Sequence, residues 1–427
     1  MASPTILLIN FHSTKNSGDL ALLEAAIRQL QSNFDLPQVI VSANYPQEEY
    51  FSENDISVVY SPATLIYSNH SLWRQVFIWL IGLIISCYSA YSTRPKAISN
   101  ASNPWRKLAA SYASADLIVS CPGNQFLSMG RFGWPMIVSA TAVYLAILFK
   151  KPLYVMPQSI GPFRRSWERR LMKWLYQHAR LVFLRDGVSF QLAKDLGLPS
   201  DRLLHVPDLA LAGEPISDRG SIPLPNKPTI DPARGFIGVT VIRKLLKTLK
   251  GEEIEKYHTA LAGALTFMVR KYDPNILFIP QVTGPTEAED DRIAARLIRD
   301  RMGIPIVRVY LFEDHLSTVE LKALYRHMDI MVASRLHSGI FSLSVGTPTL
   351  FIGYLTKTRG VIEDLDMGEW LIELDRFEEA ELVHKLEKLW QNRIQVREEI
   401  NRCLPVWIKG VEQVGLRIAQ DYQSVWT

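Results

Sequence analysis

The segment SRLHSG, residues 334–339, has the residue types best suited to acid–base and anion chemistry. It follows a buried apolar strand and precedes a helical pattern. The free N–H groups and dipole of a helix N-terminus attract anions, and Arg335 adds a positive charge there. If the segment is extended, Arg335 and His337 project to the same side. Because histidine exchanges protons near neutral pH, His337 could move a proton beside a bound anion, whereas an isolated histidine is usually structural.

A second positive charge is expected at the start of the next helix. An apolar strand at residues 348–352 is followed by TKTRG, residues 356–360, which opens a helical pattern. Lys357 would then lie beside the positive end of a helix dipole, which is unfavourable unless an anion is shared between the two. Simple solvent exposure of Lys357 is the alternative. Arg243, after the strand expected at residues 236–242, is a further cationic candidate.

The first expected strand, residues 5–10, is followed by the polar segment NSGD, residues 16–19, and a helical pattern. Asn16 opens this loop, and Gly18 permits a tight turn. Asp19 is either the N-cap of the helix, a position that aspartate favours, or a ligand or acid–base group. The spacing is not a GxGxxG fingerprint, and no Walker loop occurs in the sequence.

Three further loops place polar side chains directly after buried strands. Asn124 lies in PGNQF, and Gln158 and Ser159 lie in PQSIGPF. The glycines of these loops let the backbone approach a ligand, although purely structural turns fit equally well. Arg185 ends a buried strand, where an arginine is rarely unpaired. It either pairs with the adjacent Asp186 or points beyond the strand end and binds an anion.

Short apolar strands alternate with helical stretches along most of the chain, which predicts right-handed β–α–β units and parallel sheets. The expected fold class is α/β, with two doubly wound, Rossmann-like domains that face a cleft. Such sheets bind ligands beyond the carboxyl ends of their strands. The expected boundaries are an N-terminal domain at 1–212, a proline-rich linker at 213–234, a second domain at 235–376 and C-terminal helices at 377–427.

Residues 75–93 carry no charged side chain, and their centre, VFIWLIGLII, is apolar on all sides. About 18 apolar residues are enough to span a bilayer. Serines dilute the second half, and a span would separate the first strands from the sheet that they should join. A span is therefore the least favoured of three alternatives, and the other two are a helix buried against protein and a helix in the membrane interface with Trp73 and Trp79 as anchors.

The composition, 48% hydrophobic and 21% charged, excludes a disordered chain. A net charge of +4 is too small to indicate a nucleic-acid-binding protein. The three cysteines, Cys87, Cys121 and Cys403, are far apart, so neither a disulfide framework nor a metal site is expected. No export signal is recognised at the N-terminus, so the expected location is the cytoplasm, alone or with peripheral contact at the inner face of the membrane.

Together these segments resemble the polysaccharide pyruvyl transferase family. The resemblance rests on NSGDLALLEA, PQSIGPF, RDGVS, PDLAL and SRLHSGIFSLSVGTPTLFIGY, followed by TKTRG. They occur in the family's order over most of residues 5–370. The resemblance implies two Rossmann-type domains, similar to those of GT-B glycosyltransferases. It also implies that the family's functional arginine, histidine and lysine correspond to Arg185, His337 and Lys357.

Members of that family transfer the enolpyruvyl unit of phosphoenolpyruvate to two sugar hydroxyls and form a cyclic ketal. The implied partners are phosphoenolpyruvate, a donor substrate rather than a cofactor, and a sugar or lipid-linked saccharide. The expected donor-binding residues are Arg185, Arg335, Lys357 and Ser338. His337 would be the catalytic acid, and Asp19 or Asp186 would accept a hydroxyl proton. The loop residues expected to line the cleft are Asn16, Gly18, Asn124, Gln158, Ser159 and Arg243.

The sequence leaves two alternative functions open. A GT-B glycosyltransferase that uses a nucleotide sugar would share the architecture and a cationic diphosphate site. A non-catalytic, membrane-docked subunit of a polysaccharide assembly complex would have no need of arginine, histidine and lysine at strand ends. The acceptor sugar and the oligomeric state are not predicted.

Overall fold

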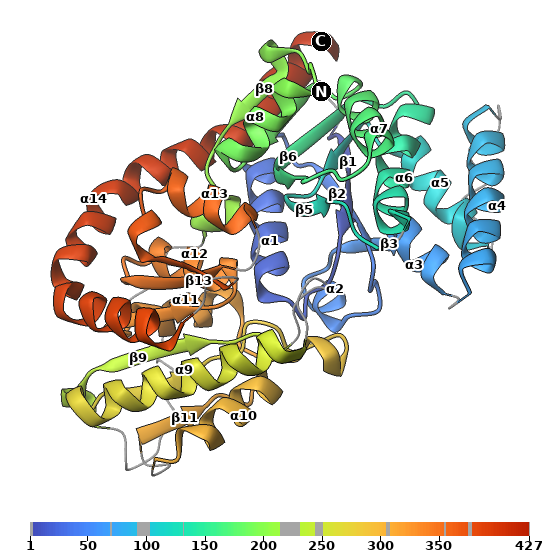
Figure 1. Ribbon diagram of the computed structural model, residues 1–427. Helices are drawn as coiled ribbons and strands as arrows, with labels where there is room; N and C mark the ends of the chain where they lie inside the picture. Colours follow the sequence, from blue (N-terminus) through green and yellow to red (C-terminus); the bar gives the residue numbers. More distant parts are fainter. Residues whose placement is uncertain are drawn as a thin grey trace. The chain divides into compact units, whose positions relative to one another are not determined.

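The structure is a computed structural model that describes residues 3–68, 71–91, 103–130, 132–213, 231–243, 251–304, 308–353, 356–374 and 378–426 (Figure 1). The chain divides into two units. The first unit consists of Met1–Thr14, Leu22–Leu209 and Gly410–Thr427, and the second of Lys15–Ala21 and Ala210–Lys409. Each unit is built on its own parallel sheet.

The sheet of the first unit has the order β3-β2-β1-β4-β6-β7-β8, and β5 pairs with β6. Its most central strands, β4 and β6, are buried along their whole length, as their nearly continuous apolar sequences indicate. The strands are β1 (Thr5–Phe11), β2 (Gln38–Ala43), β3 (Ser57–Tyr60), β4 (Leu117–Ser120), β5 (Gly123–Phe126), β6 (Leu153–Ile160), β7 (Leu181–Leu184) and β8 (Leu203–His205).

Helices connect these strands, and apolar residues of the helices and strands form one core that includes Leu7, Ile118, Val143 and Leu175. The first turn of α1 groups with the second unit, whereas the rest of that helix belongs to the first. The helices are α1 (Ser17–Asn33), α2 (Glu49–Glu53), α3 (Pro62–Tyr67), α4 (Leu72–Tyr91), α5 (Pro104–Ser114), α6 (Trp134–Leu148), α7 (Ser166–Gln177) and α8 (Gly187–Asp195).

The sheet of the second unit has the order β11-β10-β9-β12-β13-β14. Counted from β9, this is the 3-2-1-4-5-6 order of a Rossmann fold, so the order reverses between β9 and β12. The strands are β9 (Phe236–Thr240), β10 (Asn275–Phe278), β11 (Val309–Leu311), β12 (Ile330–Ala333), β13 (Thr349–Gly353) and β14 (Leu371–Glu373). The helices that follow strands are α9 (Gly251–Tyr272), α10 (Asp291–Met302), α11 (Thr318–Arg326), α12 (Leu336–Ser344) and α13 (Thr356–Asp364).

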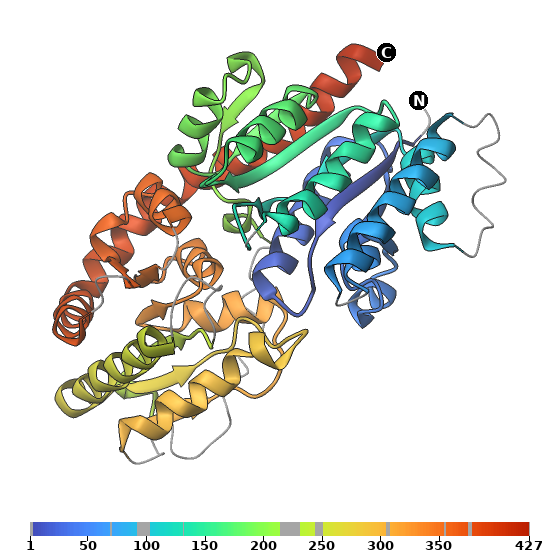
Figure 2. The ribbon, with the colours of Figure 1, turned by 45° about the vertical axis from the view of Figure 1, so that its right-hand side comes forward.

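The C-terminal region is a single helix, α14 (Glu379–Trp426), rather than several helices (Figure 2). Its residues up to Lys409 group with the second unit, and those from Gly410 group with the first. In the first unit Asp421 pairs with Arg180 at 2.8 Å and accepts the hydroxyl of Tyr154 at 2.8 Å. The helix therefore contributes to both units instead of forming the separate segment expected at 377–427.

The proline-rich linker expected at 213–234 falls mainly on residues 214–230, which lie outside the described residues. Within the described part, Pro232–Arg234 form a short 3-10 helix that leads into β9. The division between the two units falls between Leu209 and Ala210.

Candidate active site in the second unit

The N-termini of helices α12 and α1 meet at His337. His337 is the second residue of α12, and Gly18 is the second residue of α1. A Cβ atom added to Gly18 would lie 2.2 Å from Nδ1 and 2.7 Å from Cβ of His337. The backbone of Gly18 is not in the left-handed region, so this glycine is required for space and not for the tight turn that the sequence suggests. Its missing side chain lets α1 begin directly against the imidazole ring.

The segment SRLHSG is the start of a helix and not an extended loop. Arg335 is the N-cap of α12, with an extended backbone, and His337 lies in the first helical turn. The hydroxyl of Ser338 donates to the carbonyl of Arg335 at 2.7 Å and lies 2.7 Å from that of Thr240 at the end of β9. The condition of an extended segment is therefore not met, but both residues lie at one helix N-terminus, where backbone N–H groups have no helical partner.

Asn16, and not Asp19, caps helix α1. The side-chain oxygen of Asn16 accepts the N–H of Gly18 at 3.0 Å and that of Asp19 at 3.4 Å, and its amide donates to the Asp19 carboxylate at 2.9 Å. The N–H of Ser17 donates to the carbonyl of Gln281 at 3.1 Å, which joins this first turn to the end of the β10 strand. Asp19 thus holds the side chain of the capping Asn16 in place, and its role as a general base stays a prediction.

Arg335 forms an ion pair with Asp291, the first residue of α10. Asp291 was not among the site residues expected from the sequence. The Nη2 atom of Arg335 lies 2.5 Å from Oδ1 of Asp291 and its Nε atom lies 3.3 Å from Oδ2. Asp291 is fully buried and also accepts the N–H of Val282 at 3.0 Å, whereas the Arg335 side chain is 20% exposed. The guanidinium is held in place while part of it reaches solvent. The sequence signal for Asp291 is an acidic pair, Asp290-Asp291, that opens a helical pattern.

Asp291 is expected to make the stability of the second unit depend on pH. Burial raises the pKa of Asp291 to about 6, although the Arg335 guanidinium acts to lower it. This pKa is above the ordinary value of 3.8. Burial of the Asp291 carboxyl therefore contributes stability that is fully present below about pH 4 and is lost as the pH rises through about 6. In wild type the free energy of unfolding, measured by urea denaturation, should fall by about 3 kcal/mol over this pH range, and in Asp291→Asn this fall should be absent. A variant that keeps the wild-type pH dependence would contradict this assignment.

Two arginines that follow neighbouring strands contact the same short turn. Arg243, after β9, donates to the carbonyl of Glu287, and Nη2 of Arg335, after β12, lies 3.5 Å from the carbonyl of Glu289. Strands β9 and β12 pair where the strand order reverses. Open α/β sheets bind ligands beyond the strand ends at this point. The structure thus brings Arg243, Arg335 and His337 to the position where this kind of sheet binds a ligand.

Lys357 is the second residue of α13, so its backbone lies at a helix N-terminus as the sequence indicates. Its side chain lies outside the described residues. Its role in donor binding therefore stays a prediction.

Arg185 belongs to a buried polar network in the first unit. Its Nη1 atom lies 2.7 Å from Oδ2 of Asp208, and both side chains are 0% exposed. Its Nε atom donates to the hydroxyl of Ser159 at 2.9 Å. Arg185 thus forms an ion pair with Asp208, a partner that was in neither of the two alternatives left open by the sequence. An enclosed ion pair of this kind supports a structural role, so donor binding by Arg185 needs a separate test.

Asp186 is the N-cap of α8 and is fully buried. It accepts the N–H of Ser189 at 2.7 Å and the hydroxyls of Ser159 and Ser189 at 2.7 and 2.8 Å. Gln158 is also fully buried, and its amide donates to hydroxyl and carbonyl groups at the end of β4. Asn124, in β5, is half-buried. These contacts are structural, and the catalytic or binding roles of these residues stay predictions.

Among the described residues, no group of three or more histidine, cysteine, aspartate and glutamate side chains could bind a metal ion. A hollow of about 910 Å³ lies at helices α9 and α10, lined by Thr259, Thr266, Arg270, Arg301 and Glu379 among others. None of the residues around His337 line it, so this hollow is not part of the candidate site.

A sequence model described as polysaccharide pyruvyl transferase matches residues 16–356. Among curated proteins, the amylovoran biosynthesis protein AmsJ of Erwinia amylovora is 23% identical over 263 residues. That alignment covers 61% of this chain and 63% of AmsJ, which is less than two thirds of the relative's length.

Solved structures with the same fold include enzymes that bind sugar nucleotides. The UDP-GlcNAc 2-epimerase of Neisseria meningitidis, bound to UDP-GlcNAc, has a TM-score of 0.59 at 14% identity and covers 98% of this chain and 100% of that one. HepE of Anabaena, in complex with UDP-glucose, has a TM-score of 0.55 at 14% identity and covers 99% and 100%. At such low identity the likeness concerns the fold alone, which is α/β with two Rossmann-like domains of the GT-B type.

Proposed function

The chain belongs to the polysaccharide pyruvyl transferase family, and we propose that it transfers pyruvate from phosphoenolpyruvate to two hydroxyls of one sugar. The product is a cyclic ketal on a cell-surface polysaccharide or exopolysaccharide. The family match and the likeness to AmsJ support a transferase of exopolysaccharide biosynthesis. The donor and the ketal chemistry are the parts that we propose.

The observation that carries this proposal is the meeting of two helix N-termini at His337, next to Arg335. Phosphoenolpyruvate has a phosphate and a carboxylate, and each can accept hydrogen bonds from backbone N–H groups and a guanidinium. The start of α12 supplies the N–H groups and Arg335 supplies the charge, whereas the first N–H groups of α1 are bonded within the protein. Asp291 orients Arg335 without enclosing it. Lys357, at the start of α13, is proposed as a further cation for the donor.

In the proposed reaction His337 donates a proton to the methylene carbon of phosphoenolpyruvate, which leaves an oxocarbenium-like centre at the adjacent carbon. One sugar hydroxyl adds there. The C–O bond to phosphate then breaks, and the second hydroxyl adds at the same carbon. Of the two hydroxyl protons released, one replaces the proton given by His337 and the other leaves with phosphate, so the atoms balance.

A base must accept the hydroxyl protons, and Asp19 and Asp186 are the two candidates. Asp19 follows Gly18, the residue that contacts His337, and both belong to the second unit. Asp186 belongs to the first unit, where its carboxylate accepts three hydrogen bonds. We therefore propose Asp19 as the base.

The acceptor is proposed to be a sugar or a lipid-linked saccharide. Phosphoenolpyruvate is a cytoplasmic metabolite, so we propose that the reaction takes place on the cytoplasmic side of the membrane. No resident cofactor is needed for these steps, because the donor itself supplies the activated carbon.

Donor protection against heat tests the proposal. Phosphoenolpyruvate at 100 times its dissociation constant should stabilise the protein by about 2.7 kcal/mol and raise the melting temperature. Inorganic phosphate at the same concentration is the control for simple anion binding. A shift with phosphoenolpyruvate that exceeds the shift with phosphate supports the proposal, and consumption of phosphoenolpyruvate with an acceptor confirms it.

The alternative function is a GT-B glycosyltransferase, and the likeness to HepE in complex with UDP-glucose favours it as the second candidate. Protection by UDP or GDP, with none by phosphoenolpyruvate, would select this alternative. If neither donor protects the protein, a non-catalytic subunit of a polysaccharide assembly complex is the remaining interpretation.

A further inference from the structure

Helix α4 exposes a stripe of large apolar side chains to solvent, while Ile78, Trp79 and Ile85 on its other side pack against the core of the first unit. The exposed stripe has residues at helical spacing: Trp73, Phe77, Leu80, Ile84, Tyr88 and Tyr91. Trp73 is 85% exposed and Tyr88 is 74% exposed. The buried residues of the same helix are Gly82, Ser86 and Ser89. A surface helix of a globular protein normally has polar residues on the face away from the core, whereas α4 is apolar on that face as well.

Specific contacts hold the inner face of α4 against the first unit. The indole N–H of Trp79 donates to the hydroxyl of Thr141 at 2.9 Å, and that of Trp134 donates to the side-chain oxygen of Gln75 at 2.8 Å. A Cβ atom on Gly82 would lie 2.4 Å from the ring of Trp105, so helices α4 and α5 pack closely. The exposed stripe is therefore a fixed surface.

These contacts also correct the choice of membrane anchors made from the sequence. Trp79 is fixed against α6 and forms an edge-to-face pair with Trp134. It cannot serve as an anchor in this position. Trp73 does lie on the exposed stripe, and Tyr88 and Tyr91 take the corresponding place at the other end of the helix.

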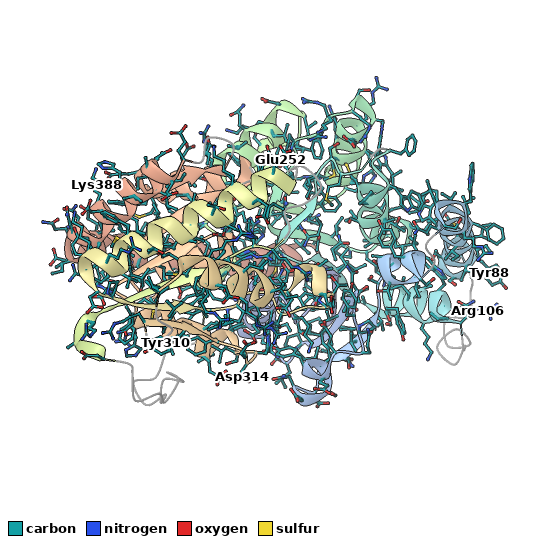
Figure 3. All side chains as sticks on the ribbon, turned by 60° about the horizontal axis from the view of Figure 1, so that its bottom comes forward. Tyr88, Arg106, Glu252, Tyr310, Asp314 and Lys388 are labelled. Carbon is teal, nitrogen blue, oxygen red and sulfur yellow. The ribbon has the colours of Figure 1, made fainter. Side chains whose placement is uncertain are left out.

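The stretch of sequence that contains this stripe carries only positive charges. Between Asp55 and Asp116 the sequence has no acidic residue, although the chain has 43 acids in 427 residues, or about six in such a length. The same stretch has five basic residues: Arg74, Arg94, Lys96, Arg106 and Lys107. Of these, Arg74, Arg106 and Lys107 are described and exposed. Figure 3 shows Tyr88 and Arg106 at the same edge of the first unit.

We propose that α4 docks the first unit on an anionic lipid bilayer and lies in its interface. A contiguous stripe of exposed apolar side chains is typical of an interaction site. Aromatic rings such as Trp73 and Tyr88 suit the headgroup level at each end of the helix. The flanking cations would contact anionic headgroups, since each basic residue near such a surface adds about 1 kcal/mol.

A position in the interface fits the structure better than a span does. Helix α4 is 20 residues long with a mean hydropathy of 1.4, so its length and composition would allow it to cross a membrane. Its inner face, however, carries hydrogen bonds and packing to α5 and α6 that a span would remove. This inference does not depend on the proposed reaction, because α4 belongs to the first unit and the candidate site belongs to the second.

Sedimentation with lipid vesicles tests the proposal on the whole chain. Wild type should pellet with vesicles of phosphatidylcholine and phosphatidylglycerol, pellet less with phosphatidylcholine alone, and detach as salt is raised. Phe77→Glu with Ile84→Glu should lower the partition coefficient by at least about tenfold, because both side chains enter the acyl boundary. The matched control is Ile394→Glu with Val406→Glu on α14, where the replaced side chains are 68% and 71% exposed.

Each other outcome overturns the docking proposal. Wild type that stays in the supernatant with anionic vesicles, or a stripe variant that pellets like wild type, excludes the lipid surface. A wild-type dimer in analytical ultracentrifugation that the stripe variant converts to monomer, with no vesicle binding, makes a second copy the occupant. Wild type that resists alkaline extraction from cell membranes would indicate a span. Circular dichroism of both variants confirms that they are folded.

Discussion

Replacing His337 by alanine is expected to lower the rate of pyruvyl transfer by about 10²–10⁴, because general acid catalysis typically contributes that factor. The affinity for phosphoenolpyruvate should change by less than about tenfold. In the proposed complex the donor is bound mainly by Arg335 and by backbone N–H groups of α12, and His337→Ala leaves these in place. Single-turnover rates and calorimetric titration of the same variant measure the two quantities.

The control for this experiment is His384→Ala. His384 is an exposed residue of α14 in the same unit, so its loss removes an imidazole without touching the candidate site. Transfer by the control should match wild type. If His337→Ala turns over like wild type, the acid is another group. If its donor affinity falls far more than tenfold, His337 acts in binding, and the proton must come from elsewhere.

The position of the candidate site could be predicted from the sequence because it depends on local patterns. A buried strand, a short polar segment and a helical pattern place Arg335 and His337 at a strand end, and the structure has them there. Asp291 could not be selected in this way. It lies 44 residues before Arg335, and an acidic residue at a helix start is usually an ordinary first-turn residue.

The sequence also could not show why position 18 requires a glycine. Its position in a polar loop suggests a turn, whereas the structure shows that it gives room to the ring of His337. Such a contact joins residues more than 300 positions apart, and a periodic pattern cannot report it. The loop's capping residue, Asn16 rather than Asp19, was equally ambiguous, because both are preferred caps.

Helix α4 illustrates a different limit. When a helix is apolar on all sides, hydrophobic periodicity no longer tells which face is buried. The small residues Gly82, Ser86 and Ser89 lie on the inner face, because they allow close packing against α5. Large apolar side chains lie on both faces, with Ile78 and Ile85 against the core and Phe77 and Ile84 exposed. The sequence therefore predicted the helix but left its environment open.

Asp208→Ala is expected to lower the free energy of unfolding of the first unit by about 3–5 kcal/mol. It leaves the guanidinium of Arg185 buried without its counter-ion, and removal of one partner from an enclosed ion pair typically costs this much. Hydrogen exchange of the β7 amides, which precede Arg185, reports the stability of this unit separately from that of the second unit.

The matched control is Arg180→Ala, in the same unit. Arg180 is 37% exposed and pairs with Asp421, which is 22% exposed and keeps its hydrogen bond from the hydroxyl of Tyr154 after the change. Ion pairs of this exposure contribute about 0–1 kcal/mol, and the loss should stay well below that of Asp208→Ala. Equal losses in the two variants would contradict the buried-pair interpretation.

A double variant of the Arg185–Asp208 ion pair tests whether Arg185 also binds the donor. The double variant Arg185→Met with Asp208→Leu replaces both charges by apolar groups of similar volume, which often leaves stability unchanged. If Arg185 is structural, this variant should be folded and should bind phosphoenolpyruvate like wild type. If Arg185 contacts the donor, as the family resemblance implies, binding should weaken by roughly 1.5–3 kcal/mol while the β7 amides stay protected. Calorimetric titration with phosphoenolpyruvate separates these results, because it measures donor affinity in a protein whose buried charges have been removed together.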